Sequence, residues 1–170
     1  MLPGLTSKMP NFSGGSKHTL KMVDKTLRIY GCADRPALKE DIREACNFLV
    51  NKLLPRKKIL HITIKRRKKL IKKSGTYGEC WQLDAPHSFE ILLDSSLSRK
   101  DCLTTLAHEL VHVKQFSRNE LKFGHSIDTW CGKKYYHGAA YESLPWEKEA
   151  TKLETVLYEE FKSRKNNNKV

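Results

Sequence analysis

Two histidines and a glutamate lie within one short segment, His108-Glu109-Leu110-Val111-His112. Histidines four residues apart on a helix lie one turn apart on the same face, so both imidazoles can bind one cation. Zinc (Zn²⁺) accepts imidazole nitrogens at about 2 Å. At about 100° per residue, Glu109 lies beside the histidines, where it can take a proton from a water molecule on the metal. The segment therefore predicts a catalytic zinc site with His108 and His112 as ligands and Glu109 as general base.

The helix that carries this segment is predicted over residues 99–117. Ser98 is a suitable N-cap residue, and Asp101 stands in the capping-box position three residues later. With His108 as the origin, His112 lies at about 40°, whereas the apolar residues of the helix lie between about 140° and 220°. These apolar residues are Leu103, Leu106, Leu110 and Val113. The two histidines thus point away from the core-facing side of their own helix, as a metal site in a cleft requires.

A catalytic zinc site needs a third protein ligand and an open fourth position. The strongest candidates are Glu147 and Glu149, at the start of a helix predicted from Pro145 to Phe161. Helical periodicity slightly favours Glu149, because it borders the apolar stripe of that helix, whereas Glu147 lies further from it. Acidic residues also favour the first turn of any helix because of its dipole, without a metal. His125 and His137 are weaker candidates, since neither has a suitable short spacing from the first two histidines.

Together with the segment Pro145-Trp146-Glu147-Lys148-Glu149-Ala150, the motif at 108–112 resembles the minimal gluzincins. The likeness extends to small SprT-like and ImmA/IrrE-like metallopeptidases, many of them phage or bacterial proteins, and covers roughly residues 88–157. It implies a small zincin-like domain that hydrolyses peptide bonds with zinc. In gluzincins the third ligand begins an E-x-x-A pattern on the helix after the active-site helix. Because that pattern begins at Glu147, the resemblance favours Glu147 over Glu149.

Two residues between these helices, Tyr141 and His137, are candidates for a further catalytic role. A tyrosine or histidine often stabilises the oxyanion in zinc peptidases. Aromatic packing is the simpler role for any one tyrosine of this region. We therefore predict an oxyanion stabiliser among these residues without choosing between them.

The chain is strongly basic, with 32 Lys and Arg against 19 Asp and Glu and a formal net charge of +13. Ten of the basic residues lie between Pro55 and Tyr77, a stretch without any acid. Five of them are consecutive: Lys65, Arg66, Arg67, Lys68 and Lys69. A solvated hairpin is the simplest interpretation, but so dense a cluster also favours binding to phosphates. Nucleic acid is therefore a candidate partner, besides a protein or peptide substrate.

Two further functions are compatible with these patterns. One is a SprT-like protease that acts on DNA-bound proteins, in which case DNA should stimulate cleavage. The other is a non-catalytic nucleic-acid-binding module that contains structural zinc. A structural zinc site is closed by four protein ligands, whereas a catalytic site keeps one position open, so the ligand count distinguishes these functions.

The elements around the site predict one α+β domain over residues 23–161, between a flexible arm at 1–22 and a polar tail at 162–170. The predicted helices span residues 37–54, 99–117 and 145–161. The predicted strands span residues 59–64, 78–83 and 88–94. Gly and Pro residues between the strands indicate tight turns and therefore a three-stranded antiparallel sheet. The three helices, one N-terminal, one carrying the active site and one C-terminal, should pack on this sheet.

The composition excludes several classes of protein. Hydrophobic residues make up 39% and charged residues 30%, as in globular chains, and no apolar run is long enough to cross a bilayer. The first residues lack the apolar core of a signal peptide. The five cysteines are scattered and form no C-x-x-C pair, so they predict no disulfide framework. We therefore expect a cytoplasmic protein without membrane attachment, associated with the nucleoid or nucleus if it binds nucleic acid.

Overall fold

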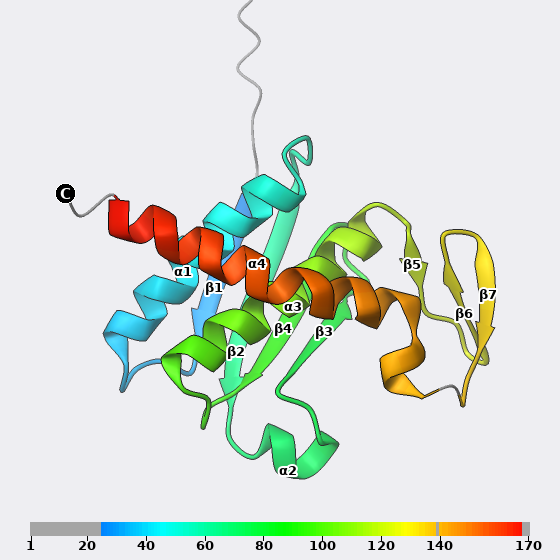
Figure 1. The fold of residues 1–170 in the computed structure, drawn as a ribbon, viewed down its shortest axis with the longest axis horizontal. Helices are drawn as coiled ribbons and strands as arrows, with labels where there is room; N and C mark the ends of the chain where they lie inside the picture. Colours follow the sequence, from blue (N-terminus) through cyan, green and yellow to red (C-terminus); the bar gives the residue numbers. More distant parts are fainter. Residues whose placement is uncertain (1–24, 139, 168–170) are drawn as a thin grey trace, which may run out of the picture.

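The computed structural model describes residues 25–138 and 140–167, which form two sheets with helices (Figure 1). The larger sheet consists of β1 (Lys25–Tyr30), β2 (Leu60–Arg67), β3 (Gly78–Gln82) and β4 (Ser88–Asp94). The smaller sheet consists of β5 (Leu121–Lys122), β6 (Ile127–Trp130) and β7 (Lys133–Tyr136). The helices are α1 (Pro36–Leu53), α2 (Leu70–Ser74), α3 (Arg99–Ser117) and α4 (Pro145–Asn167), with a 3-10 turn at Tyr141–Ser143. The predicted α+β class is confirmed.

The larger sheet is mixed, with the strand order β1-β2-β4-β3. β1, β2 and β4 are parallel, and only β3 runs antiparallel, against β4. The predicted antiparallel sheet is therefore correct for the β3–β4 pair but wrong for β2, which pairs in parallel with β4 and not with β3. The connection between these two strands contains α2 and β3, which bring the chain back so that β4 enters in the direction of β2. β1, for which no strand was predicted, is the other edge strand of this sheet.

α1 and α3 pack against one face of the larger sheet and α4 packs on α3, so the core lies between the sheet and these helices (Figure 1). β2 shows the alternation that this requires, because Ile62 and Ile64 are buried while the intervening Thr63 is partly exposed. The predicted apolar stripe of α3 is buried throughout, which confirms that side of the helix as core-facing. In the part of the chain that the structure describes, no helix combines the length and apolar character of a membrane span.

The helix ends are set by local signals. α3 begins where predicted, and the Ser98 hydroxyl accepts a hydrogen bond from the backbone N–H of Asp101 at 3.1 Å. α4 runs on to Asn167, so the predicted end of this helix at Phe161 is wrong. The stretch between α3 and α4, for which no strand was predicted, contains the smaller sheet. The predicted arm at residues 1–22 lies outside the described residues.

Asp41 ties α1 to both other long helices. Its carboxylate accepts hydrogen bonds from Arg99 Nε of α3 at 2.5 Å and from Lys165 Nζ of α4 at 2.5 Å. Burial alone would raise the pKa of Asp41, but the two cations outweigh burial and hold the pKa below its usual value. The Lys165 ion pairs hold the part of α4 beyond residue 162 against α1.

We expect Asp41→Asn to lower the free energy of unfolding at pH 7 by about 1–3 kcal/mol, because charged hydrogen bonds are lost. A carboxylate with a depressed folded-state pKa contributes stability above its unfolded pKa of about 3.9, and this is lost as the pH falls through the folded-state value. Urea unfolding should therefore show the difference at pH 7 and a smaller one below about pH 4. Glu40→Gln, on the same helix but exposed, is the control. An equal difference at both pH values would contradict this role of the Asp41 charge.

Candidate metal centre

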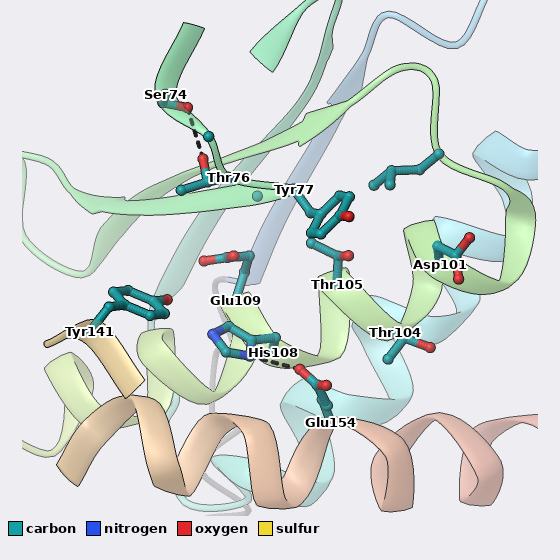
Figure 2. A pocket seen from close by; sticks show the side chains of 13 residues that line it. Ser74, Thr76, Tyr77, Asp101, Thr104, Thr105, His108, Glu109, Tyr141 and Glu154 are labelled. Carbon is teal, nitrogen blue, oxygen red and sulfur yellow. Dashed lines mark hydrogen bonds and ion pairs between the residues drawn. The ribbon is translucent and has the colours of Figure 1, made fainter. Parts of the chain in front are cut away.

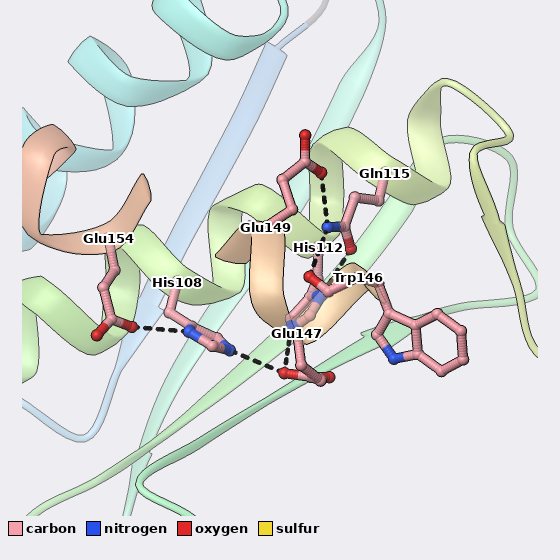
Figure 3. Close-up of polar contacts among 7 residues, drawn as sticks. All are labelled: His108, His112, Gln115, Trp146, Glu147, Glu149 and Glu154. Carbon is pink, nitrogen blue, oxygen red and sulfur yellow. Dashed lines mark hydrogen bonds and ion pairs between the residues drawn. The ribbon is translucent and has the colours of Figure 1, made fainter. Parts of the chain in front are cut away.

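His108, His112 and Glu147 come together where α4 passes over α3 (Figure 3). One ligand atom from each lies within 4.8 Å of the other two. Glu147 Oε2 is 3.2 Å from His108 Nε2 and 3.4 Å from His112 Nε2. His112 is 8% exposed and Glu147 6%. The three side chains thus enclose one small polar volume, sheltered from bulk water.

The outward nitrogen of each histidine has its own acceptor (Figure 3). His108 Nδ1 lies 2.7 Å from Glu154 Oε2, and His112 Nδ1 lies 2.8 Å from Gln115 Oε1. A proton on each Nδ1 satisfies these contacts and leaves the lone pair of each Nε2 directed at the shared volume. This is the tautomer and the kind of outer partner found on histidines that bind metals.

The charges of the group are strongly coupled. Burial lowers the pKa of both histidines, but their contacts with Glu147, and for His108 also with Glu154, outweigh burial and raise the pKa. Burial raises the pKa of Glu147, but hydrogen bonds with His108 and His112 outweigh it and lower the pKa to about 2. Glu147 is therefore ionised at neutral pH and provides a negative centre between two imidazoles.

Glu149, the other predicted candidate, lies elsewhere. Its carboxylate accepts hydrogen bonds from Lys114 Nζ at 2.6 Å and from Gln115 Nε2 at 2.9 Å. The Gln115 amide also donates to the backbone carbonyl of Trp146 at 3.0 Å. Gln115 is fully buried and thus fixes both His112 and the start of α4. Of the two glutamates, the structure brings Glu147 to the histidines and uses Glu149 to hold α4 against α3.

Glu109 is 4% exposed and is not one of the three clustered residues. Burial raises the pKa of this carboxyl to about 8, against the opposing effect of His112. β3 passes directly over it: a Cβ built on Gly78 would lie 2.6 Å from Glu109 Oε1 and 2.6 Å from Thr105 Cγ2. The glycine therefore leaves the space that the Glu109 carboxyl occupies.

A cavity of about 770 Å³ opens beside the cluster (Figure 2). One wall is the segment 74–78, which leads from α2 into β3, and the opposite wall is α3 with His108 and Glu109. Tyr141 and Glu154 line it as well. The cavity therefore gives a molecule from solution direct access to Glu109 and to one edge of the histidine cluster.

Of the two predicted oxyanion stabilisers, only Tyr141 lines this cavity. Burial and a hydrogen bond with Glu147 raise the pKa of its hydroxyl, so the hydroxyl is protonated and can donate. His137 is half exposed, and its Nε2 lies 3.3 Å from Asp128 Oδ1 in the smaller sheet. His125 is exposed and belongs to no ligand group among the described residues. The structure thus brings Tyr141, but neither of these histidines, to the site.

The basic segment is not a simple hairpin, because Lys65, Arg66 and Arg67 belong to β2. Lys65 pairs with Glu90 on the neighbouring strand. Arg66 is buried, and its guanidinium donates to the backbone carbonyls of Gly31 and Ser95 at 3.4 and 2.5 Å. The prediction that Arg66 binds a partner is therefore wrong, since it closes the end of the sheet. Arg67 and the two lysines that follow are exposed.

Sequence reasoning missed three residues that shape the site: Gly78, Gln115 and Glu154. No local pattern marks Glu154, because it acts through a contact between helices distant in sequence. Gln115 lies three residues after His112 on the same helix, but its contacts with α4 have no local signal. Gly78 was visible only as the start of a strand.

Comparisons of the chain with models of protein families, with curated proteins and with solved structures find no match. The site is therefore interpreted from its own geometry.

Proposed function

We propose that this chain is a zinc-dependent peptidase of the gluzincin type. One arrangement carries the proposal: two imidazole nitrogens and a carboxylate oxygen lie within 4.8 Å of one another. Beside them a buried carboxyl, Glu109, borders a cavity that is open to solvent. This combination meets the needs of metal-assisted hydrolysis, in which the metal and the proton acceptor are neighbours but separate.

The donor set suits zinc. Catalytic zinc sites take three nitrogen or oxygen ligands from the protein and leave one position for water or substrate. Among the described residues, the cluster supplies three such donors, and another nearby acid, Glu154, is occupied with His108 Nδ1. That count favours a catalytic over a structural site. Nitrogen and carboxylate donors also accept cobalt, manganese and nickel, so the identity of the metal is tested separately.

Zinc held by His108, His112 and Glu147 would supply a Lewis acid and lower the pKa of a water molecule to about 7. Glu109 then accepts the proton of the attacking water and passes a proton to the leaving amine. Burial raises the pKa of the Glu109 carboxyl, which suits its role as proton donor to the leaving amine. A cation beside the carboxyl opposes that rise, which suits its role as proton acceptor from water. The Tyr141 hydroxyl, at the edge of the cavity, would donate a hydrogen bond to the developing oxyanion once it leaves Glu147.

The position of β3 favours an extended peptide as substrate. β3 stands at the end of the strand order, so within the described residues one of its edges is unpaired. The segment that leads into it forms a wall of the cavity. A peptide that adds to such an edge is held by backbone hydrogen bonds. Because Gly78 lies over Glu109, this mode would place a scissile bond within reach of the general base.

Metal loading and proteolysis test the proposal together. We expect the metal-free protein to take up one equivalent of zinc, measured by plasma mass spectrometry, and to cleave unfolded casein. A chelator should stop cleavage and added zinc should restore it. Parallel loading with cobalt, manganese and nickel identifies which metals support turnover. Zinc uptake without cleavage would favour the non-catalytic module, and cleavage that survives complete metal removal would contradict the mechanism.

Gly78→Ala should reduce turnover without removing the metal. The added methyl would lie 2.6 Å from Glu109 Oε1, closer than real contacts allow, so the carboxyl has to move. A displaced general base costs about tenfold or more in kcat. The measurement is kcat on a quenched fluorescent peptide, with the zinc content determined in the same samples. Gln82→Ala, at the far end of β3 and exposed, should leave both unchanged; wild-type kcat in Gly78→Ala would show that the close approach has no role.

A further inference from the structure

Five exposed cations lie on the connection from β2 through α2, and we call them the α2 cluster. Its members are Arg67, Lys68, Lys69, Lys72 and Lys73. Within the described residues, none of the five has an ion pair. Other cations of the protein do, such as Lys65 with Glu90 and Lys165 with Asp41 and Glu44. Like charges held together without counter-charges repel one another, so this cluster favours an anionic partner.

The α2 cluster is held at the rim of the cavity. Leu70 of α2 is buried, and the backbone N–H of Ile71 donates to Asp94 Oδ2 at 3.0 Å, which fixes the helix to the end of β4. Ser74 and Thr76, which directly follow the last lysine of the cluster, line the cavity across from Glu109 (Figure 2). α2 itself protrudes beyond the end of the sheet (Figure 1). The cations therefore lie next to the cavity wall formed by residues 74–78, and none of them lines the cavity itself.

The cavity itself has the opposite charge. Asp101, Glu109 and Glu154 line it, and neither lysine nor arginine does so among the described residues. The cluster therefore cannot act on the scissile bond, but it can act on a more distant part of a molecule that enters the cavity. The carboxylates of Asp101 and Glu154 would also repel a phosphate backbone that continued into the cavity. This favours a peptide over a nucleic acid as the partner of the cluster.

We propose that the α2 cluster selects substrates that carry an acidic segment on one side of the scissile bond. This inference rests on the proposed peptidase function and names its substrate class. A peptide paired with β3 passes Glu109 at Gly78 and continues along Thr76 and Ser74 to α2. At about 3.3 Å per residue, its acidic side chains would meet the cluster roughly three to six residues from the scissile bond.

Binding to the zinc-loaded Glu109→Gln protein tests the inference without turnover. The probes are labelled peptides with one common centre and a flank of Glu, Gln or Lys at either end, followed by fluorescence anisotropy. A Glu flank should strengthen binding about tenfold over a Gln flank at low salt, at one of the two ends only. The advantage should shrink between about 50 and about 500 mM NaCl, because salt screens exposed charges.

Matched charge variants locate the effect. Lys72→Gln with Lys73→Gln should abolish the preference for the acidic flank. The control variant, Arg56→Gln with Lys58→Gln, removes the same amount of charge just before the first residue of β2, at the other end of that strand. It should preserve the preference for the acidic flank. Equal binding of the Glu and Lys flanks, or a preference that survives in the Lys72 and Lys73 variant, would overturn the inference.

Two further outcomes separate this inference from the alternatives. Wild-type protein that shows the binding preference but cleaves nothing with zinc would overturn the proposed function while supporting an acidic-segment site. A labelled DNA strand serves as competitor. If DNA displaces the acidic peptide, and its binding alone falls in the Lys72 and Lys73 variant, the occupant is nucleic acid and the inference is overturned.

Discussion

Zinc-loaded Glu109→Gln should retain its metal and lose about a hundredfold to ten-thousandfold of its peptide cleavage. Glutamine has nearly the same shape as glutamate, so it fits under Gly78, but its amide cannot accept a proton from water. Glu109 is not one of the three clustered donors, so the metal site itself keeps its ligands. The loss should appear in kcat, because the proton transfer belongs to the transition state.

The control for this variant is Glu79→Gln, a neighbouring carboxylate on β3 that does not line the cavity. It should preserve both zinc content and kcat.

The burial of Glu109 gives a second readout for the Glu109→Gln variant. Replacing a carboxyl that is 4% exposed with a neutral amide should not destabilise the metal-free fold, as measured by urea unfolding. Normal hydrolysis by Glu109→Gln would contradict the proposed mechanism outright.

The histidine pair and its helix could be predicted because every determinant is local. The spacing of His108 and His112, the apolar stripe opposite them and the cap at Ser98 all lie within twenty residues of one helix. Helical geometry converts such spacing directly into a shared face. α3 accordingly begins and ends at the predicted residues, and its stripe is buried.

The order of the larger sheet could not be predicted in the same way. Turn residues between the strands indicated adjacent antiparallel pairs, which holds for β3 and β4. The parallel pairing of β2 with β4 depends on the path of the chain through α2, and that path depends on contacts such as Ile71 with Asp94. The dense charge of residues 65–69 also concealed that β2 continues to Arg67, with Arg66 turned inward to the carbonyls of Gly31 and Ser95.

The choice between Glu147 and Glu149 is a question of how two helices meet. Although Glu147 is the more buried of the two, periodicity on α4 measured only the distance from its apolar stripe and so favoured Glu149, at the border of that stripe. What it meets there is Lys114 and Gln115 of α3, which occupy its carboxylate. Glu147, two residues earlier on the same helix, contacts the histidines instead. A pattern within one helix cannot contain this information, because it belongs to the helix pair.

Glu147→Ala and Glu149→Ala should therefore have opposite profiles. Loss of Glu147 removes one of three donors and should weaken zinc binding by at least about a hundredfold, since even the loss of an outer partner costs tenfold to a hundredfold. Loss of Glu149 leaves all three donors in place. It removes the acceptor of Lys114, a buried lysine that keeps only Glu120, so the free energy of unfolding should fall by about 1–3 kcal/mol.

Thermal unfolding with and without zinc separates the two effects in one measurement, because a ligand that binds only the folded state raises its Tm. Glu149→Ala should start from a lower Tm and keep a zinc-dependent increase. Glu147→Ala should lose that increase, and a competition titration with a chromophoric chelator should show the corresponding loss of affinity. The reverse pattern would assign the third ligand to Glu149. It would also mean that α4 sits differently on α3 when the metal is bound, because the Lys114 and Gln115 contacts would then have to break.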